Sequence, residues 1–328
     1  MTSTVRSQML GLFRSSCYSF AALLLLSLAG YSQSLPAPPL PPPVIAVRTE
    51  LVVLPVRVTD ANGDFVSGLS ADDFRVYQDR HLQELSLFQR EDTPVAVGLL
   101  VDHSRSMGPK LAEVVSAIVA FSKSSNPQDE MFVVDFNDDV SLELPGGTPF
   151  THDPMELVKA VSAVSARGRT ALYDAVNVGL NHLLLATTDK RALIIVSDGG
   201  DNASQHKYGE ILAAARRSQT VIYSIGLIGD PNQEDEDPKL LQRLCNETGG
   251  IAFFPMARES VTDVSARIAR DLREQYTLGF SPDNNNGGQS FRKIEVKVTA
   301  PGRGKIHVQT RRGYFNAERP ADPGKPAS

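Results

Sequence analysis

The sequence predicts an α/β domain with a doubly wound, mostly parallel sheet that is inserted into a small β-sandwich. Two observations support this prediction. Between residues 94 and 274, short apolar runs alternate with stretches of helical periodicity, which is the order of a βαβ fold. Residues 44–92 and 275–316, which flank this region, show instead the two-residue alternation of β-strands. We therefore expect the two flanks to share one β-domain around the central one.

The composition is that of a soluble globular protein. The chain has 328 residues, of which 41% are hydrophobic and 22% are charged, so a sizeable core can form. The formal net charge at pH 7 is -5. This charge argues against a nucleic-acid partner, because contacts with phosphates require a basic surface.

The N-terminus has the layout of an export signal, and we predict a signal peptide over residues 1–34. Arg6 and Arg14 precede the apolar run "CYSFAALLLLSLAGY" (17–31), and the small or polar residues "SQS" follow it. The run is shorter than the roughly 20 residues that a membrane-spanning helix needs. An uncleaved membrane anchor is the alternative. We expect a secreted protein, or one in the periplasm or cell envelope, without a stable membrane span after cleavage.

The segment after the signal is rich in proline. Residues 35–43, "LPAPPLPPP", favour a polyproline II linker that acts as a semi-rigid spacer. At the other end of the chain, we expect residues 317–328 to be a disordered tail. If the signal is removed, Cys17 leaves with it, and Cys245 is predicted to be a small buried hydrophobic residue.

The two flanking regions contain about seven predicted strands. In residues 44–92, Val52, Leu54, Val56 and Val58 share one face of a strand, and "FRVYQD" and "LQELSLFQ" follow. In residues 275–316 the predicted strands are "YTLGF", "RKIEVKV" and "KIHVQTRRGYF". Neither flank can bury a core alone. Together they have the strand number of an immunoglobulin-like sandwich.

The central region supplies the elements of the parallel sheet. The predicted strands are "VAVGLLVD", "MFVVDF", "ALIIVSD" and "TVIYSIGL". Helical stretches lie between them. The first of these stretches, "KLAEVVSAIVAF", places one set of apolar residues on a single face: Leu111, Val114, Val115, Ile118 and Val119. Strands and helices in alternation predict a parallel sheet that is covered on both faces.

Small oxygen-bearing side chains follow the ends of two predicted strands. Asp102, Ser104 and Ser106 come at alternate positions after the first strand, and Asp198 follows "ALIIVS". Thr170 lies in a glycine-containing loop just before a helix. Ligands of open α/β sheets bind outside the carboxyl ends of the strands. Two carboxylates and three hydroxyls are hard oxygen donors, which suit Mg²⁺, Mn²⁺ or Ca²⁺ rather than zinc or copper.

These residues resemble a known family. "DHSRS" is similar to the D-x-S-x-S signature of von Willebrand factor A domains, and "GRTAL" and "VSDGG" are similar to the second and third loops of their metal-ion-dependent adhesion site. The flanks "ADDFRVYQD", "YTLGFSP" and "RRGYF" look like those of bacterial secreted von Willebrand factor A-related proteins. The resemblance implies a Rossmann-like fold for residues 94–274.

The resemblance also implies roles for the five residues. Ser104, Ser106 and Thr170 would bind Mg²⁺ directly, and Asp102 and Asp198 directly or through water. One coordination position would stay open for an Asp or Glu carboxylate of a protein partner. The expected function is therefore an exported binding or adhesion module with a divalent metal, and not an enzyme.

Other functions stay open at this stage. One is a metal-dependent hydrolase, and another is a structural envelope scaffold whose metal site is unused. Several catalytic motifs are missing. A haloacid dehalogenase-type phosphatase would need a second Asp where Ser104 stands, and the sequence has no G-x-S-x-G, zinc or P-loop motif. The sequence therefore favours the binding module.

Overall fold

The computed structural model describes residues 51–90, 92–229, 236–255, 260–282 and 291–315. The predicted signal peptide (1–34), proline-rich linker (35–43) and C-terminal tail (317–328) lie outside the described residues. Within the described ranges, no helix combines the length and the apolar character that a membrane crossing requires.

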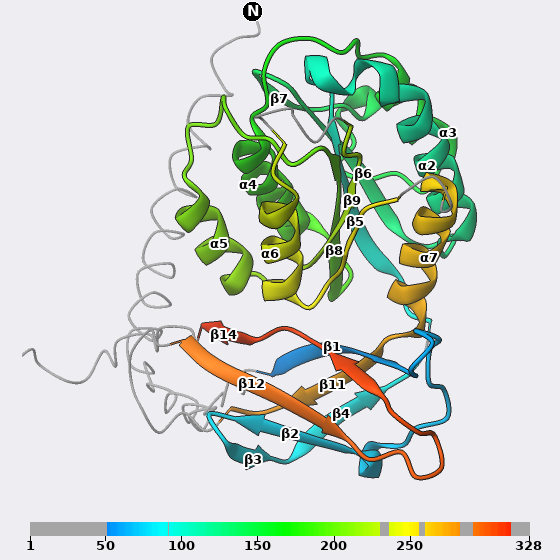
Figure 1. Cartoon of the computed structure of the whole chain (residues 1–328), viewed down its shortest axis with the longest axis vertical. Helices are drawn as coiled ribbons and strands as arrows, with labels where there is room; N and C mark the ends of the chain where they lie inside the picture. Colours follow the sequence, from blue (N-terminus) through cyan, green and yellow to red (C-terminus); the bar gives the residue numbers. More distant parts are fainter. Residues whose placement is uncertain (1–50, 91, 230–235, 256–259, 283–290, 316–328) are drawn as a thin grey trace, which may run out of the picture. The chain divides into compact units, whose positions relative to one another are not determined.

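A six-stranded sheet forms the centre of the α/β domain (Figure 1). Its strand order is β10-β9-β8-β5-β6-β7. All pairs are parallel except β6 with β7. This arrangement confirms the predicted mostly parallel sheet. The strands are β5 (Val95–Asp102), β6 (Glu130–Phe136), β7 (Val140–Leu142), β8 (Lys190–Ser197), β9 (Val221–Gly226) and β10 (Ala252–Phe253).

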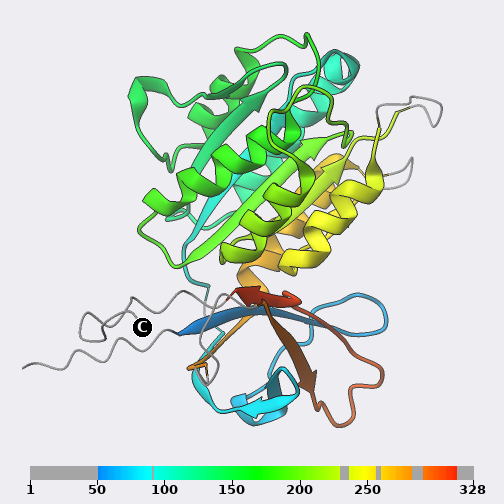
Figure 2. The same cartoon turned by 90° about the vertical axis from the view of Figure 1, so that its left-hand side faces the viewer.

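Helices cover both faces of this sheet, as Figures 1 and 2 show. One face carries α2 (Leu111–Ser124), α3 (Pro154–Ser162) and α7 (Val261–Glu274), and the other carries α4 (Leu172–His182), α5 (Tyr208–Arg217) and α6 (Pro238–Thr248). Four short 3₁₀ helices complete the described helical segments: η1 (Ala71–Asp73), η2 (Arg105–Lys110), η3 (Pro145–Gly147) and η4 (Leu183–Leu185). Every residue of β5 is buried, which is expected for a central strand between two helical layers.

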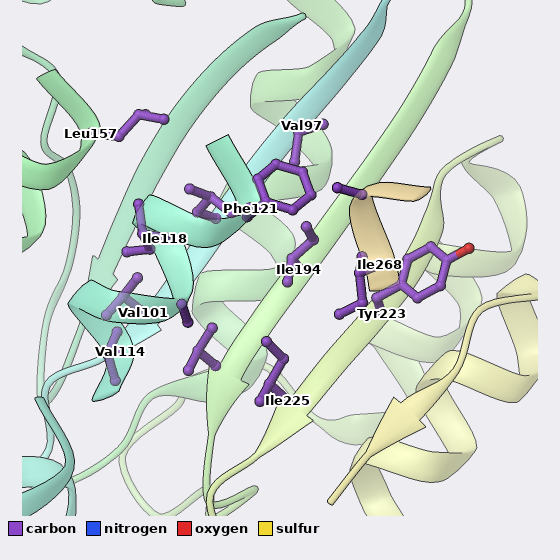
Figure 3. Close-up of a cluster of buried hydrophobic side chains, with 14 of the residues drawn as sticks. Val97, Val101, Val114, Ile118, Phe121, Leu157, Ile194, Tyr223, Ile225 and Ile268 are labelled. Atoms are coloured by element: carbon purple, nitrogen blue, oxygen red, sulfur yellow. The ribbon is translucent and has the colours of Figure 1, made fainter. Parts of the chain in front are cut away.

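The core beneath α2 contains only part of the predicted helical face (Figure 3). Val114 and Ile118 are buried as predicted, but Leu111, Val115 and Val119 are only half-buried. Ala117 and Phe121 complete the buried stripe instead. Positions 114, 117, 118 and 121 follow the i, i+3, i+4, i+7 spacing, so the helix presents the stripe that contains the large Phe121 ring. Cys245 is fully buried, as expected for a small hydrophobic residue.

The flanking strands form two further four-stranded sheets, with orders β13-β1-β11-β4 and β14-β12-β2-β3. Each sheet combines strands from both flanks: β1 pairs with β11, and β2 pairs with β12. Alternate residues of β1, from Val52 to Val58, are buried in a third core cluster around Tyr276. The strands are β1 (Val52–Thr59), β2 (Phe74–Gln78), β3 (His81–Gln83), β4 (Leu85–Gln89), β11 (Tyr276–Phe280), β12 (Phe291–Val298), β13 (His307–Gln309) and β14 (Gly313–Phe315).

Two segments that were each expected to be one strand are divided between the two sheets. In "LQELSLFQ", β3 pairs with β2 but β4 pairs with β11. In "KIHVQTRRGYF", β13 pairs with β1 but β14 pairs with β12. The chain turns a corner between the two sheets in each of these segments. The two-residue alternation continues through the corner, because each half still has one buried face. The described flanks therefore contain eight strands instead of the expected seven.

Candidate metal-binding site

The five predicted site residues lie at the carboxyl ends of the parallel strands. Asp102 ends β5, and Ser104 and Ser106 follow it at the start of η2. Thr170 immediately precedes the N-cap residue of α4, and Asp198 follows the last residue of β8. Because β5 and β8 are neighbours in the sheet, Asp102 and Asp198 emerge from adjacent strand ends. The fold therefore brings all three loops to the same edge of the sheet.

The first loop folds back on its own carboxylate. The backbone amide of Ser104 donates to Oδ1 of Asp102 at 2.8 Å. The hydroxyls of Ser104 and Ser106 are 3.1 Å apart and share a hydrogen bond. Asp102 and Ser104 are buried, whereas Ser106 is half-buried. The alternate spacing of the three residues thus gathers their oxygens in one small region.

The second loop is joined to the first through the backbone. The amide of Arg167 donates to the carbonyl of His103 at 2.8 Å, and the amide of Arg105 donates to the carbonyl of Gly168 at 3.3 Å. These bonds bring the strand-end loop alongside the segment that leads to Thr170, which is itself buried.

Asn202 joins the second loop to the third. Its side-chain Oδ1 accepts from the amide of Thr170 at 2.9 Å. In return, the amides of Asn202 and Ala203 donate to the carbonyl of Thr170 at 2.9 and 3.0 Å. These three bonds use only the backbone of Thr170 and leave its hydroxyl out. The position of Thr170 is therefore fixed by the chain that follows Asp198.

Ser197 links the two carboxylate-bearing strand ends. Its hydroxyl donates to Oδ2 of Asp102 at 2.6 Å and accepts from the amide of Gly199 at 3.0 Å. The amide of Gly200 in turn donates to Oδ1 of Asp198 at 3.3 Å. Asp198 is only 2% exposed, so both carboxylates of the cluster are buried.

The electrostatic environment of Asp102 disfavours its charged form. The pKa of Asp102 is raised to about 6, mainly by burial, and the nearby charge of Asp198 contributes a smaller increase. Hydrogen bonds from Ser104 and Ser197 act in the opposite direction, to a smaller extent. Among the described residues, the groups that bond to this carboxylate are neutral. Two buried carboxylates at adjacent strand ends are an environment suited to a bound metal ion.

A buried contact between His103 and Asp135 also holds the first loop. Nδ1 of His103 contacts Oδ1 of Asp135, and both side chains are almost fully buried. The amide of His103 also donates to the carbonyl of Phe136 at 2.8 Å. Since Asp135 and Phe136 belong to β6, this pair ties the loop after β5 to the neighbouring strand.

The residues that position the site were not predicted from the sequence. Ser197 and Asn202 do not belong to the donor set, yet they hold Asp102 and Thr170. For Ser197 the available signal was a hydroxyl directly before Asp198 at a strand end. Asn202 offered only its place in "SDGGDN", and the contact between His103 and Asp135 joins two distant segments without any local pattern.

The donor set matches a hard divalent cation in its chemistry. Two carboxylates and three hydroxyls are oxygen ligands of the kind that Mg²⁺ and Ca²⁺ prefer. Within the described ranges, no three or more His, Cys, Asp or Glu side chains gather to hold a metal. The cluster around Asp102 is a different type of arrangement, because most of its donors are hydroxyls.

The fold and this edge of the sheet define a class of protein: a Rossmann-like α/β domain with carboxylates and hydroxyls gathered outside the ends of parallel strands. The family model of the von Willebrand factor type A domain matches residues 97–267, which is just over half of the chain. The chain belongs to the von Willebrand factor type A domain family.

Solved structures are similar to this chain at low sequence identity. A von Willebrand factor type A protein from Catenulispora acidiphila is 12% identical, with a TM-score of 0.50, over 81% of this chain and 73% of that one. BatB from Bacteroides thetaiotaomicron is 18% identical, with a TM-score of 0.43, over 54% of this chain and 97% of that one. The pilus adhesin SpaC from Lactobacillus rhamnosus GG is 10% identical, with a TM-score of 0.46, over 78% of this chain and 49% of that one. Among curated proteins, no relative matches the sequence.

Proposed function

We propose that this chain is an exported binding module that captures a protein partner through a divalent metal ion. The observation that carries the proposal is the buried pair Asp102 and Asp198 at adjacent strand ends, with three hydroxyl-bearing residues on the same edge. Mg²⁺ is the proposed ion, and Mn²⁺ and Ca²⁺ suit the same oxygen donors.

Each residue has a distinct part in this proposal. Ser104, Ser106 and Thr170 supply neutral oxygens, and Asp102 and Asp198 supply the negative charge. When bound, the cation offsets the repulsion between the two carboxylates and offers a position to an Asp or Glu carboxylate of the partner. Ser197 and Asn202 keep the donors in place through their hydrogen bonds to Asp102 and Thr170.

The contacts of the hydroxyls support binding over hydrolysis. A serine nucleophile needs a base within hydrogen-bond reach. The hydroxyls of Ser104 and Ser106 bond to each other, and the nearby imidazole Nδ1 of His103 contacts Asp135 instead. This arrangement suits ligation of a cation better than activation of a nucleophile.

The proposed location is outside the cytoplasm, either secreted or in the cell envelope. The layout of residues 1–34 supports this part of the proposal, because it has the charge and apolar pattern of an export signal. N-terminal sequencing of the protein after expression in a secreting host tests it. A mature chain that starts near residue 34 is expected, whereas a retained Met1 in the membrane fraction would contradict export.

A titration of thermal stability tests the metal proposal. A ligand that binds only the folded state stabilises it by about 2.7 kcal/mol at a hundredfold excess over its Kd. Mg²⁺ should therefore raise the melting temperature of the wild type. Asp102→Ala should abolish the rise, and Ser104→Ala should reduce it. Asp64→Ala, which removes an exposed carboxylate of the flanking β-region, serves as the matched control.

A capture experiment then tests the partner. The wild type and Asp102→Ala are immobilised and exposed to an envelope extract, each with Mg²⁺ or with a chelator. The proposal is supported if the wild type retains a protein with Mg²⁺ but not with the chelator, and Asp102→Ala retains it under neither condition. An unchanged melting temperature of the wild type in millimolar Mg²⁺ and Mn²⁺ would falsify the metal proposal. Equal retention of the partner by the wild type and Asp102→Ala would contradict the role of the metal in capture.

A further inference from the structure

A second candidate site lies at the opposite end of the parallel sheet from Asp102. A groove of about 460 Å³ runs between the first residues of β5, β8 and β9 and the outer face of the sheet that contains β1, β11 and β4. Sites for small molecules have volumes of about 300–1,000 Å³. The groove is therefore large enough for a ligand of its own.

The floor of this groove is largely apolar. In the strand register, Val53 of β1 and Leu87 of β4 lie on either side of Gly279. Gly279 has no side chain, and a Cβ placed there would lie only 2.8 Å from Cβ of Leu87. The Leu51 side chain packs over the glycine, since its Cδ2 would lie 3.2 Å from the same Cβ, and it adds to the apolar lining. Leu272 of α7 adds a further apolar side chain to the lining.

Two buried polar atoms in the lining of the groove have no hydrogen-bond partner. They are Oγ1 of Thr277 and Nε of Arg191. The Thr277 residue is only 4% exposed, so solvent does not satisfy its hydroxyl. A buried donor without a partner costs stability, and a ligand that accepts a hydrogen bond removes that cost. Both atoms can donate, so they favour a ligand with acceptor oxygens.

Two cationic side chains and one carboxylate line the groove. Its charged lining residues are Lys190, Arg191 and Asp189, which leaves one net positive charge. Lys190 is half-buried, and its burial lowers the pKa of its ammonium group, although Asp92 and Asp129 act against this change. An anion that binds beside Lys190 would restore favourable interactions to the charged ammonium.

We propose that this groove binds an aliphatic carboxylate of medium chain length. The hydrocarbon chain lies against the apolar lining of Leu51, Val53 and Leu87, and the carboxylate accepts from Arg191 and Thr277. An aliphatic body fits because no aromatic residue lines the groove. This site is separate from the proposed metal site, since β5 begins at Val95 beside the groove and ends at Asp102.

Calorimetric titration of the full mature chain tests this inference, with decanoate, decanol and decyltrimethylammonium as probes below their aggregation concentrations. We expect decanoate to bind, decanol to bind at least tenfold more weakly, and the cationic probe not to bind. Thr277→Val keeps the shape of the side chain and removes the donor, so it should weaken decanoate binding about tenfold. Arg191→Gln should weaken it at least as much.

Two controls make the result decisive. Arg217→Gln removes an exposed guanidinium on α5 and should leave decanoate binding unchanged. A chelator should also leave it unchanged, which separates this inference from the metal proposal. The groove is not a carboxylate site if decanoate does not bind the wild type. The same conclusion follows if Thr277→Val binds decanoate as tightly as the wild type does and the wild type binds decanol as tightly as decanoate. Thr277→Val decides the question if Arg191→Gln does not fold.

Discussion

The hydroxyl of Ser197 lies 2.6 Å from Oδ2 of Asp102 and donates a hydrogen bond to it across two adjacent parallel strands. The same hydroxyl accepts from the amide of Gly199, the residue after Asp198. One small side chain therefore fixes the carboxylate at the end of β5 and the loop that carries the second carboxylate. This neutral donor therefore connects the two strand ends that carry the acidic groups.

Removal of this donor should destabilise the protein. Ser197→Ala leaves Oδ2 of Asp102 without its bond in a buried position, so the free energy of unfolding should fall by about 1–3 kcal/mol. Urea denaturation at pH 7 in the presence of a chelator measures the change. Ser116→Ala, whose exposed hydroxyl bonds to the carbonyl of Ala112 in α2, should change the value by less than about 0.5 kcal/mol. Equal effects of the two substitutions would contradict the role given to Ser197.

The raised pKa of Asp102 predicts a pH dependence for the metal-free protein. The folded-state pKa is about 6, whereas the ordinary value is 3.8. Between these values the folded protein holds the proton more tightly than the unfolded chain, so stability falls as the pH rises from about 4 to above 6. A shift from 3.8 to about 6 corresponds to about 3 kcal/mol.

Asp102→Asn isolates this contribution, because the other acidic groups titrate in both proteins. Urea denaturation in chelator at several pH values gives the free energy of unfolding of wild type and Asp102→Asn. As the pH rises, the wild type should lose stability relative to Asp102→Asn. A difference that stays constant from pH 4 to pH 7 would show that Asp102 keeps an ordinary pKa in the folded state.

Asn202 should affect the rise of the melting temperature with Mg²⁺, although it is not one of the five proposed ligand residues. Asn202→Ala removes the acceptor for the amide of Thr170 and should cost about 0.5–1.5 kcal/mol of stability. Because Thr170 is then held less firmly, the rise of the melting temperature with Mg²⁺ should be smaller than in the wild type. Asn181→Ala, at an exposed position of α4, is the control and should keep the full rise.

Arg311 and Arg312 are neighbours in the sequence but should differ greatly in their contribution to the free energy of unfolding. Arg311 is buried and donates to the carbonyls of Arg216 and Ser218 at the end of α5, at 2.6 and 3.1 Å. Burial lowers the pKa of Arg311 to about 10, so its guanidinium remains charged at neutral pH. Arg311→Gln should lower the free energy of unfolding by about 2–4 kcal/mol, because it leaves these carbonyls without a donor.

Arg312 provides the matched control. Its side chain is 66% exposed and lies 3.7 Å from Glu247, so Arg312→Gln should cost less than about 1 kcal/mol. Guanidinium chloride denaturation of both variants measures the difference. A larger loss for Arg312→Gln than for Arg311→Gln would show that the buried guanidinium does not hold α5.

Gly98 is required by the packing of the central strand. A Cβ at this position of β5 would lie 2.7 Å from Cδ2 of Leu193 and even closer to the ring of Phe132. Gly98→Ala should therefore destabilise the fold by about 1–3 kcal/mol, as measured by thermal unfolding. Gly209→Ala meets no atom within 4 Å in α5 and should be neutral or stabilising by up to about 1 kcal/mol.

The parallel sheet was predictable because its strands are buried on both faces and appear as continuous apolar runs. The ends of those runs also located Asp102 and Asp198, since a strand end is visible in the residues themselves. The partners of these residues were not visible. The bond between Thr170 and Asn202 joins residues 32 positions apart, and nothing local in either segment specifies it. The division of "LQELSLFQ" between two sheets was missed for the same reason, because a corner depends on which distant strand pairs with each half.

The pairing of the first described strand also has a consequence for the order of folding. The neighbours of β1 in its sheet are β11 and β13, which begin at Tyr276 and His307, whereas β1 ends at Thr59. During synthesis, β1 therefore emerges long before either strand that will pair with it, and the complete α/β region is made in between. Such long loop closures give a high contact order and slow folding. Until they occur, β1 presents unpaired amides and carbonyls on both edges, which makes the growing chain vulnerable to association with other extended segments.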